Sequence, residues 1–331
     1  TNSTTCLTNT NGCVPLNIFG TGVASEAAIR YVNVKPGQNY QDQKFQQDVY
    51  AATLQGTLPF GLAAGPIAAA VGIEYRGEKG VTLTDPGAPD RAYALGNFSP
   101  FEGRYHVAEG FAEFDVPLLR DQGVESLSFN AAGRLTNYST SGTVVTWKFG
   151  LTSQVNQSIR LRGTVSRDIR APSLSDLFTA GVATTGSAID PNTGQNVFIY
   201  TYRTGNPNLK PEKAITYSAG LVLTPSFIPR LNISVDYYNI NLSDAIGSVA
   251  TSTILSRCAD GESNFCDLLV FDGPGGALSQ INRYPLNVGK QKASGFDFQA
   301  DYSVPVAGGD LNLRLLGNYI LNQEQNQLGS V

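Results

Sequence analysis

The four cysteines of the chain fall into two close pairs. Cys6 and Cys13 are seven residues apart, and Cys258 and Cys266 are eight apart. Both pairs lie in segments rich in Asn, Thr, Ser, Gly and Asp, and local pairs in such loops are typical of disulfides made in an oxidising compartment. A zinc site would need further Cys or His nearby, and His106 is the only His. We therefore predict two disulfides, with metal ligation or free thiols as the alternative.

Side chains that could catalyse a reaction are few and poorly placed. A Ser-His-Asp or Cys-His arrangement needs a positioned base, and His106 stands beside Tyr105 at the start of an expected strand, where a solvated position is the simpler interpretation. Glu109 and Glu113 would lie about 13 Å apart along a strand, farther than the carboxylates of glycosidases. The glycine-rich stretch 273–278 precedes no helical pattern, which argues against phosphate binding. We predict neither an enzyme nor a bound cofactor.

One acidic loop carries the oxygen ligands that Ca²⁺ prefers, but its spacing matches no known calcium loop. Its side chains are Asp260, Glu262, Asp267 and Asp272. We therefore predict no metal site in the chain.

Composition leaves two classes of protein open. Charged residues make up 15% of the 331 residues, against roughly 25% in soluble globular chains, and hydrophobic residues make up only 41%. A surface that partly faces lipid would produce this combination, and a soluble β protein rich in Ser, Thr and Asn is the alternative. The net charge of −4, without a basic cluster, argues against nucleic-acid binding. No run approaches the roughly 20 apolar residues of a transmembrane helix.

The dominant pattern is an alternation of apolar and polar side chains with a period of two residues, which is typical of strands. In 143–154, for example, Val145 and Trp147 take one face while Thr146 and Lys148 take the other. The predicted strands are 44–58, 66–77, 104–117, 125–138, 143–154, 158–169, 214–224, 231–242, 293–304 and 311–320. Most of these segments approach or exceed the roughly 9–11 residues with which a tilted strand crosses a bilayer.

The links between these strands alternate in length. Short links fall near 59–65, 118–123, 155–157, 225–230 and 305–310. Long links fall near 78–103, 170–213 and 243–284, and the tight turn at 139–142 is an exception on the long side. Short turns at one end and long loops at the other are the layout of outer-membrane barrels. The predicted fold class is therefore all-β, a transmembrane antiparallel β-barrel.

A barrel of this kind makes two further groups of residues interpretable. Aromatic side chains near strand ends suit an interfacial girdle, although ordinary cross-strand packing is the alternative. The girdle candidates are Tyr75, Tyr138, Tyr237, Tyr238 and Tyr319. Arg160, Arg162 and Arg170 share the face that would line the lumen, where carboxylates or solvent could compensate their charge, and Arg167 falls on the apolar face.

Several segments resemble, in order, the sequence blocks of TonB-dependent receptors. RLRGTVSRDIRAPSLSDLF (160–178) resembles their signature, in which a strand ends in Arg-Ala-Pro, and GNPNLKPEKAITYSAGLVLTP (205–225) resembles the next block. The signature residues are Arg170, Ala171, Pro172, Asn208, Leu209, Pro211 and Glu212. Similar blocks at 13–20, 58–79, 108–119, 236–247, 254–266 and 287–305 extend the resemblance over nearly the whole chain. Pro172 and Pro211 would stop strand pairing at both ends of the intervening loop.

This resemblance implies that the ten strands belong to a 22-stranded barrel, with a plug domain in its lumen and a TonB box through which TonB drives transport. We find no plug or TonB box before Thr1 and no terminal aromatic strand before Val331, and the chain contains no Met. We therefore interpret residues 1–331 as a partial TonB-dependent receptor β-barrel domain, with the plug and the C-terminal strands outside it. The implied location is the bacterial cell outer membrane, and the implied partners are the plug, TonB and outer-membrane lipid.

The expected function is TonB-dependent uptake of a nutrient such as a ferric siderophore, cobalamin or an oligosaccharide. The alternatives are a passive porin-like channel and a soluble β-rich ligand-binding or adhesin protein. Aromatic side chains of the long loops could form a lip that contacts a small-molecule or oligosaccharide ligand, or they could pack the loops together. The lip candidates are Tyr93, Phe98, Tyr200 and Tyr202, with Phe101, Phe178, Phe198 and Phe271 as further members.

Overall fold

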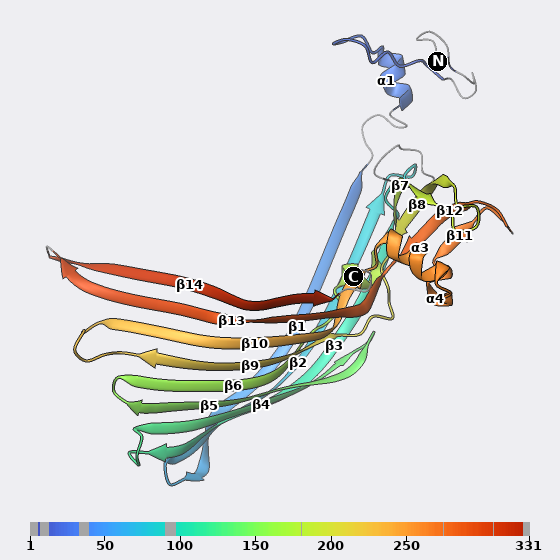
Figure 1. Cartoon of the computed structure of the whole chain (residues 1–331). Helices are drawn as coiled ribbons and strands as arrows, with labels where there is room; N and C mark the ends of the chain where they lie inside the picture. Colours follow the sequence, from blue (N-terminus) through green and yellow to red (C-terminus); the bar gives the residue numbers. More distant parts are fainter. Residues whose placement is uncertain are drawn as a thin grey trace.

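The computed structural model describes residues 6, 13–32, 40–89, 97–179, 181–273, 275–306 and 308–326. Ten long strands form one curved antiparallel sheet, which we call the large sheet (Figure 1). In sheet order they are β1 (Gln41–Leu62), β2 (Gly65–Thr84), β3 (Phe101–Arg120), β4 (Ser126–Tyr138), β5 (Gly142–Asn156), β6 (Ile159–Arg170), β9 (Glu212–Leu223), β10 (Leu231–Ser248), β13 (Pro285–Val306) and β14 (Gly309–Asn326). All ten predicted strands are confirmed, and so is the all-β antiparallel class.

The two faces of the large sheet differ in polarity, because neighbouring strands pair in a register that puts like residues side by side. Phe129 of β4 pairs with Leu151 of β5, and Phe149 pairs with Val165 of β6. On this apolar face Leu151 is 46% exposed, and among the described residues no helix or second sheet packs against it. Further exposed members of the face are Leu54, Val71, Ile73, Leu135, Val145, Leu161, Phe298, Leu313 and Leu315. An extended, uncovered apolar surface of this kind suits contact with acyl chains.

The opposite face, which we call the polar face, is crossed by ion pairs between strands. These pairs include Arg134–Glu109, Arg162–Asp236 and Arg314–Asp301. The Arg162 guanidinium reaches over β9 and donates to both carboxylate oxygens of Asp236, at 2.7 and 2.6 Å. Gly220 lies between them, and a Cβ there would come within 2.0 Å of Asp236 Oδ1. Arg162 therefore has a specific partner, whereas Arg167 lies on the apolar face opposite Trp147, as expected.

The girdle prediction is wrong for two of its five tyrosines. Tyr75 and Tyr319 are exposed, but Tyr138 is buried among side chains of the polar face. Tyr238 also points to the polar face, where its hydroxyl accepts a hydrogen bond from Asn318 Nδ2 at 3.2 Å. Tyr237 and Tyr238 are adjacent in one strand, so they cannot both face the same side.

The long loops gather at one end of the large sheet, which we call the loop end, and the short turns lie at the other, the turn end (Figure 1). The long links 170–213 and 243–284 both contain regular structure, which the sequence pattern did not predict. Their elements are α2 (Leu174–Phe178), β7 (Val182–Ile189), β8 (Asn196–Arg203), α3 (Thr251–Ala259), α4 (Ser263–Cys266), β11 (Leu269–Phe271) and β12 (Leu278–Arg283). A further short helix, α1 (Glu26–Val32), precedes β1.

Four of these strands form a second sheet, the small sheet, in the order β11-β12-β8-β7. Strands β8 and β12 come from different loops and run parallel to each other, so their pairing joins the two loops into one unit. One face of the small sheet is covered by α3 and α4 through a shared apolar core. Its buried members are Ile199, Val249, Ile254, Phe265, Leu268, Leu269, Leu278 and Ile281.

In the described part of the chain, no helix has the length and apolar character needed to cross a membrane.

The polarity of the two faces predicts how a charge is tolerated on each. Leu151→Arg places a guanidinium on the apolar face near the middle of β5, where contact with acyl chains would cost about 2–4 kcal/mol. Thr216→Arg, on the polar face of β9, is the matched control and should cost far less. Urea-induced unfolding of the receptor in lipid vesicles, expressed with every segment that its gene encodes, measures both. Equal losses would contradict the assignment of the faces.

Candidate functional site

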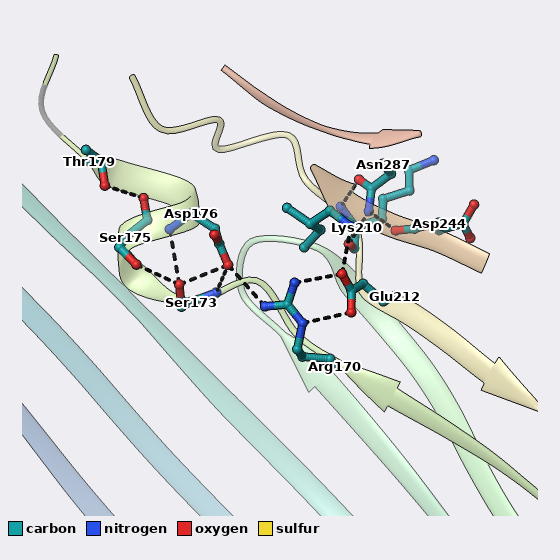
Figure 2. A network of polar contacts seen from close by, with 10 residues as sticks. Arg170, Ser173, Ser175, Asp176, Thr179, Lys210, Glu212, Asp244 and Asn287 are labelled. Atoms are coloured by element: carbon teal, nitrogen blue, oxygen red, sulfur yellow. Dashed lines mark hydrogen bonds and ion pairs between the residues drawn. The ribbon is translucent and has the colours of Figure 1, made fainter. Parts of the chain in front are cut away.

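An ion pair at the loop end joins the ends of three strands. Arg170 ends β6 and Glu212 begins β9, and the two residues are register partners. The guanidinium donates to both carboxylate oxygens, Nε to Oε2 at 2.7 Å and Nη2 to Oε1 at 2.6 Å (Figure 2). Glu212 Oε1 also accepts the backbone N–H of Ile246 in β10 at 2.7 Å. The buried carboxylate, 6% exposed, therefore links β6, β9 and β10.

The same arginine fixes the start of helix α2. Ser173 caps the helix, and its hydroxyl accepts the N–H of Asp176 while the Asp176 carboxylate accepts the N–H of Ser173, which is a capping box. Asp176 Oδ2 also lies 3.4 Å from Arg170 Nη1 (Figure 2). Arg170 thus touches one carboxylate on the strand end and one on the loop helix, so that the loop is tied to the large sheet.

The second half of the signature fastens the loop where it returns to β9. The Asn287 side chain of β13 donates to the carbonyl of Lys210 at 2.7 Å and accepts the Lys210 N–H at 2.8 Å. It also donates to the carbonyl of Asp244 at 2.9 Å. Asn208 donates its N–H to the side chain of Asn206, which in turn donates to the carbonyl of Pro285 at 2.9 Å. We call Arg170, Asp176, Glu212 and Asn287, with their bonds, the rim clamp.

An apolar cluster seats α2 on the polar face of the large sheet. Its buried members are Tyr105, Val107, Tyr138, Val144, Leu174, Leu177 and Leu209, with Ala171 packed against them. Two glycines permit the close approach. A Cβ at Gly103 would lie 2.4 Å from the ring of Phe178, and one at Gly205 would lie 2.5 Å from the backbone of Leu177. The signature residues Ala171 and Leu209 therefore act by packing, and Phe178 packs the loop rather than forming a lip.

Both predicted disulfides are present. Cys6 bonds to Cys13, and Cys258 bonds to Cys266, so that α3 is joined to α4 beside the core of the small sheet.

The turn between β7 and β8 is held by the buried Asp190, whose carboxylate accepts the N–H groups of Asn192 at 2.9 Å and Leu278 at 3.3 Å. These hydrogen bonds, that from Asn192 foremost, lower the pKa of Asp190 below its ordinary value.

The lip candidates are only partly brought together. Tyr200 and Tyr202 share one face of β8 with Phe198, the face opposite the buried Ile199. Phe198 is 62% exposed and meets the Tyr200 ring edge-on at 5.3 Å. Phe98 forms a bridge with Val182 at the start of β7. Tyr93 lies outside the described residues, and Phe271 packs against the core of the small sheet.

Sequence reasoning missed the residues that β12 adds beside this aromatic row. Gln280 and Asn282 are the parallel register partners of Tyr200 and Tyr202, and Gln280 Nε2 donates to Asn282 Oδ1 at 2.8 Å. The sequence could not predict that β12 lies beside β8, because the two strands are about 80 residues apart in the chain. Parallel strands are also not joined by a turn that a local sequence pattern could reveal.

The described residues contain no group of three or more His, Cys, Asp or Glu side chains that could hold a metal ion. Glu262 of the acidic loop is instead paired with Arg257 at 2.6 Å. His106 stacks on the Tyr75 ring with centroids 6.0 Å apart, which is a packing contact.

A two-faced antiparallel sheet with long loops at one end is the arrangement of strands found in outer-membrane β-barrels. Residues 7–330 match the family model described as TonB dependent receptor-like, beta-barrel. The chain belongs to this family, whose members are receptors and transporters of the outer membrane and not enzymes.

Solved structures of several receptors share the fold. They include the siderophore receptor PirA from Acinetobacter baumannii (16% identity, TM-score 0.55, covering 84% of this chain and 37% of that one). A variant of the ferric enterobactin receptor PfeA from Pseudomonas aeruginosa has 17% identity and a TM-score of 0.57, covering 84% and 36%. The RagAB peptide transporter has 16% identity and a TM-score of 0.55, covering 87% and 31%. The chain thus spans little more than a third of the first two structures. No curated protein matches it.

The rim clamp predicts that the loop and the strand ends loosen together. Arg170→Ala leaves the buried Glu212 without its charge partner, which should cost about 1.5 kcal/mol, at the low end for charged hydrogen bonds because Arg170 is half exposed. Hydrogen exchange should quicken at the Ile246 amide and through α2. Arg162→Ala is the matched control, because it breaks an equivalent bidentate pair and should leave these amides protected. Unchanged exchange in Arg170→Ala would show that the clamp does not hold the loop.

Proposed function

We propose that this chain forms part of the barrel wall and the ligand-capturing loops of an energised outer-membrane receptor that imports a scarce nutrient. The observation that carries the proposal is that one structure combines an uncovered apolar face with folded loops at one end. An uncovered apolar face suits a lipid bilayer, and at the loop end the two long loops fold into a small sheet with its own core. Membership of the receptor family supports the same conclusion.

The partners follow from the family. A plug domain would lie against the polar face, which carries the ion-paired side chains of β3, β6, β10 and β13, and TonB would act on that plug. The transported compound is a ferric siderophore, cobalamin or an oligosaccharide. Two of the similar structures are receptors for siderophores and one is a transporter for peptides, which supports a ligand of small to moderate size rather than one named compound.

Two alternatives are weaker. A soluble adhesin would have to hide the apolar face, and in the described residues nothing covers it. A passive porin would favour an open pore, whereas α2 packs at the loop end on the polar face, which is the face that would line the lumen.

The test is whether uptake needs energy. Cells that carry the receptor, expressed with every segment its gene encodes, are offered labelled ferric enterobactin, cobalamin or a maltooligosaccharide. One compound should accumulate against its gradient, and loss of TonB or addition of an uncoupler should abolish the accumulation. Cells without the receptor give the background. Uptake that persists at the same rate without TonB would establish the porin instead.

The aromatic row of β8 should contribute to ligand capture. The double variant Tyr200→Ala with Tyr202→Ala removes two rings, each of which could stack on a ligand for roughly 0.5–1.5 kcal/mol. The affinity of the receptor for the compound that it imports should therefore fall about tenfold or more. The circular dichroism of the barrel should stay unchanged. Phe227→Ala removes an exposed ring at the turn end and serves as the control. An unaltered dissociation constant in the double variant would remove the row from the binding site.

A further inference from the structure

A pocket of about 440 Å³ lies between the small sheet and the loop end of the large sheet. Its walls come from five places in the chain: α2, the first residues of β7, the last residue of β8, the end of β10, and the junction between β12 and β13. The volume falls within the range of small-molecule sites. The pocket is separate from the aromatic row, which lies on the other face of the small sheet.

Two arginines stand side by side in this pocket. Arg203 and Arg283 are the last residues of β8 and β12, and they are register partners in the parallel pair. They lie on the same face as Ile199 and Ile281, which α3 and α4 cover. At the end of the strands this cover stops, and the two guanidinium groups line the pocket.

The two positive charges have no carboxylate of their own in the described part of the chain. Arg283 is held in place by neutral acceptors, since its Nε donates to the carbonyl of Val249 at 2.9 Å and its Nη2 lies 3.5 Å from Ser248 Oγ. Burial, and then the charge of Arg203, lower the pKa of Arg283. The acidic side chain in the pocket wall, Asp176, is already bound to Ser173 and Arg170 in the rim clamp.

A pair of like charges on neighbouring strands destabilises a sheet unless a counter-charge is present. A guanidinium offers a planar fork of N–H donors that matches the two oxygens of a carboxylate or phosphate group. Serine and threonine residues of α2, β7 and β10 also line the pocket and suit a polar ligand, beside apolar residues such as Val182 and Ile246. The arrangement therefore lacks one component, which is an anion.

We propose that the pocket binds an oxyanionic group, a carboxylate or phosphate, of the soluble ligand that the receptor captures, with Arg203 and Arg283 as the two donors. This assignment rests on the proposed uptake function, and it narrows the ligand to compounds that carry such a group. The aromatic row and the pocket lie on opposite faces of the small sheet, so they form two separate contact sites.

The test measures binding without transport. The full-length receptor in detergent is titrated by calorimetry with citrate, with inorganic phosphate and with glucose as the neutral control. Citrate, phosphate or both should bind with glucose inert, and Arg203→Gln should weaken that binding about tenfold or more. Arg203→Lys keeps the charge but loses the planar pair of N–H donors, so its anion affinity should lie between those of the wild type and Arg203→Gln. Arg230→Gln is the matched control, because it removes the same charge from an exposed pair with Asp310 at the turn end.

Each result decides the proposal. Binding of citrate alone assigns a carboxylate, and binding of phosphate alone assigns a phosphate group. Failure of both anions to bind overturns the proposal, and so does an equal loss in Arg203→Gln and Arg230→Gln, which would indicate only the overall charge. Thermal unfolding checks that Arg203→Gln is folded; without anion its melting temperature should equal or exceed that of the wild type. A receptor that binds citrate but shows no energised uptake would refute the transport function and leave the pocket standing.

Discussion

Backbone pairing across the large sheet is the constraint on which the rest of the structure depends. In hydrocarbon no water is present to bond an N–H or C=O group, so each strand needs a partner on both sides. The eight inner strands of the large sheet have a partner on both sides, and the edge strands β1 and β14 have one each. The strands are 12 to 22 residues long. Once the register is set, every second side chain must face the same way, and the apolar and polar faces follow. A shift of one residue in any strand would exchange its two faces.

The rim clamp solves the problem that this constraint creates at the loop end. Where the strands stop, their last backbone groups lose their partners, and a loop of about forty residues has to leave from β6 and return to β9. Arg170 and Glu212 stand at the point of departure and the point of return, and the buried carboxylate also takes up the Ile246 N–H of β10. The two prolines beside them prevent the pairing from continuing into the loop. The signature residues Arg170 and Glu212 thus anchor the loop, because they fix the positions of its two ends relative to β6, β9 and β10.

The anchored loops then form something that neither could form alone. Strand β8 from one loop pairs with β12 from the other, and the core beneath them combines Ile199 with Ile254 and Ile281. The Cys258–Cys266 disulfide restrains the helices that cover this core. This unit presents aromatic and amide groups on one face and two neighbouring arginines at the end of the other. The proposed ligand capture at the loop end depends on this composite unit, because its side chains are brought together by the pairing of β8 with β12.

The sequence by itself determined the large sheet, the two disulfides and the positions of the signature. Alternation with period two marks each long strand locally and shows which of its side chains share a face. All ten strands were therefore predictable. The sequence did not determine the content of the long loops, the burial of Tyr138, the face to which Tyr238 points, or the partners of Arg162 and Arg203. Those depend on which strand lies next to which, and on side chains from segments as much as 80 residues apart. Cross-strand neighbours, and above all a parallel pair without a turn between its strands, are a property of the tertiary structure alone.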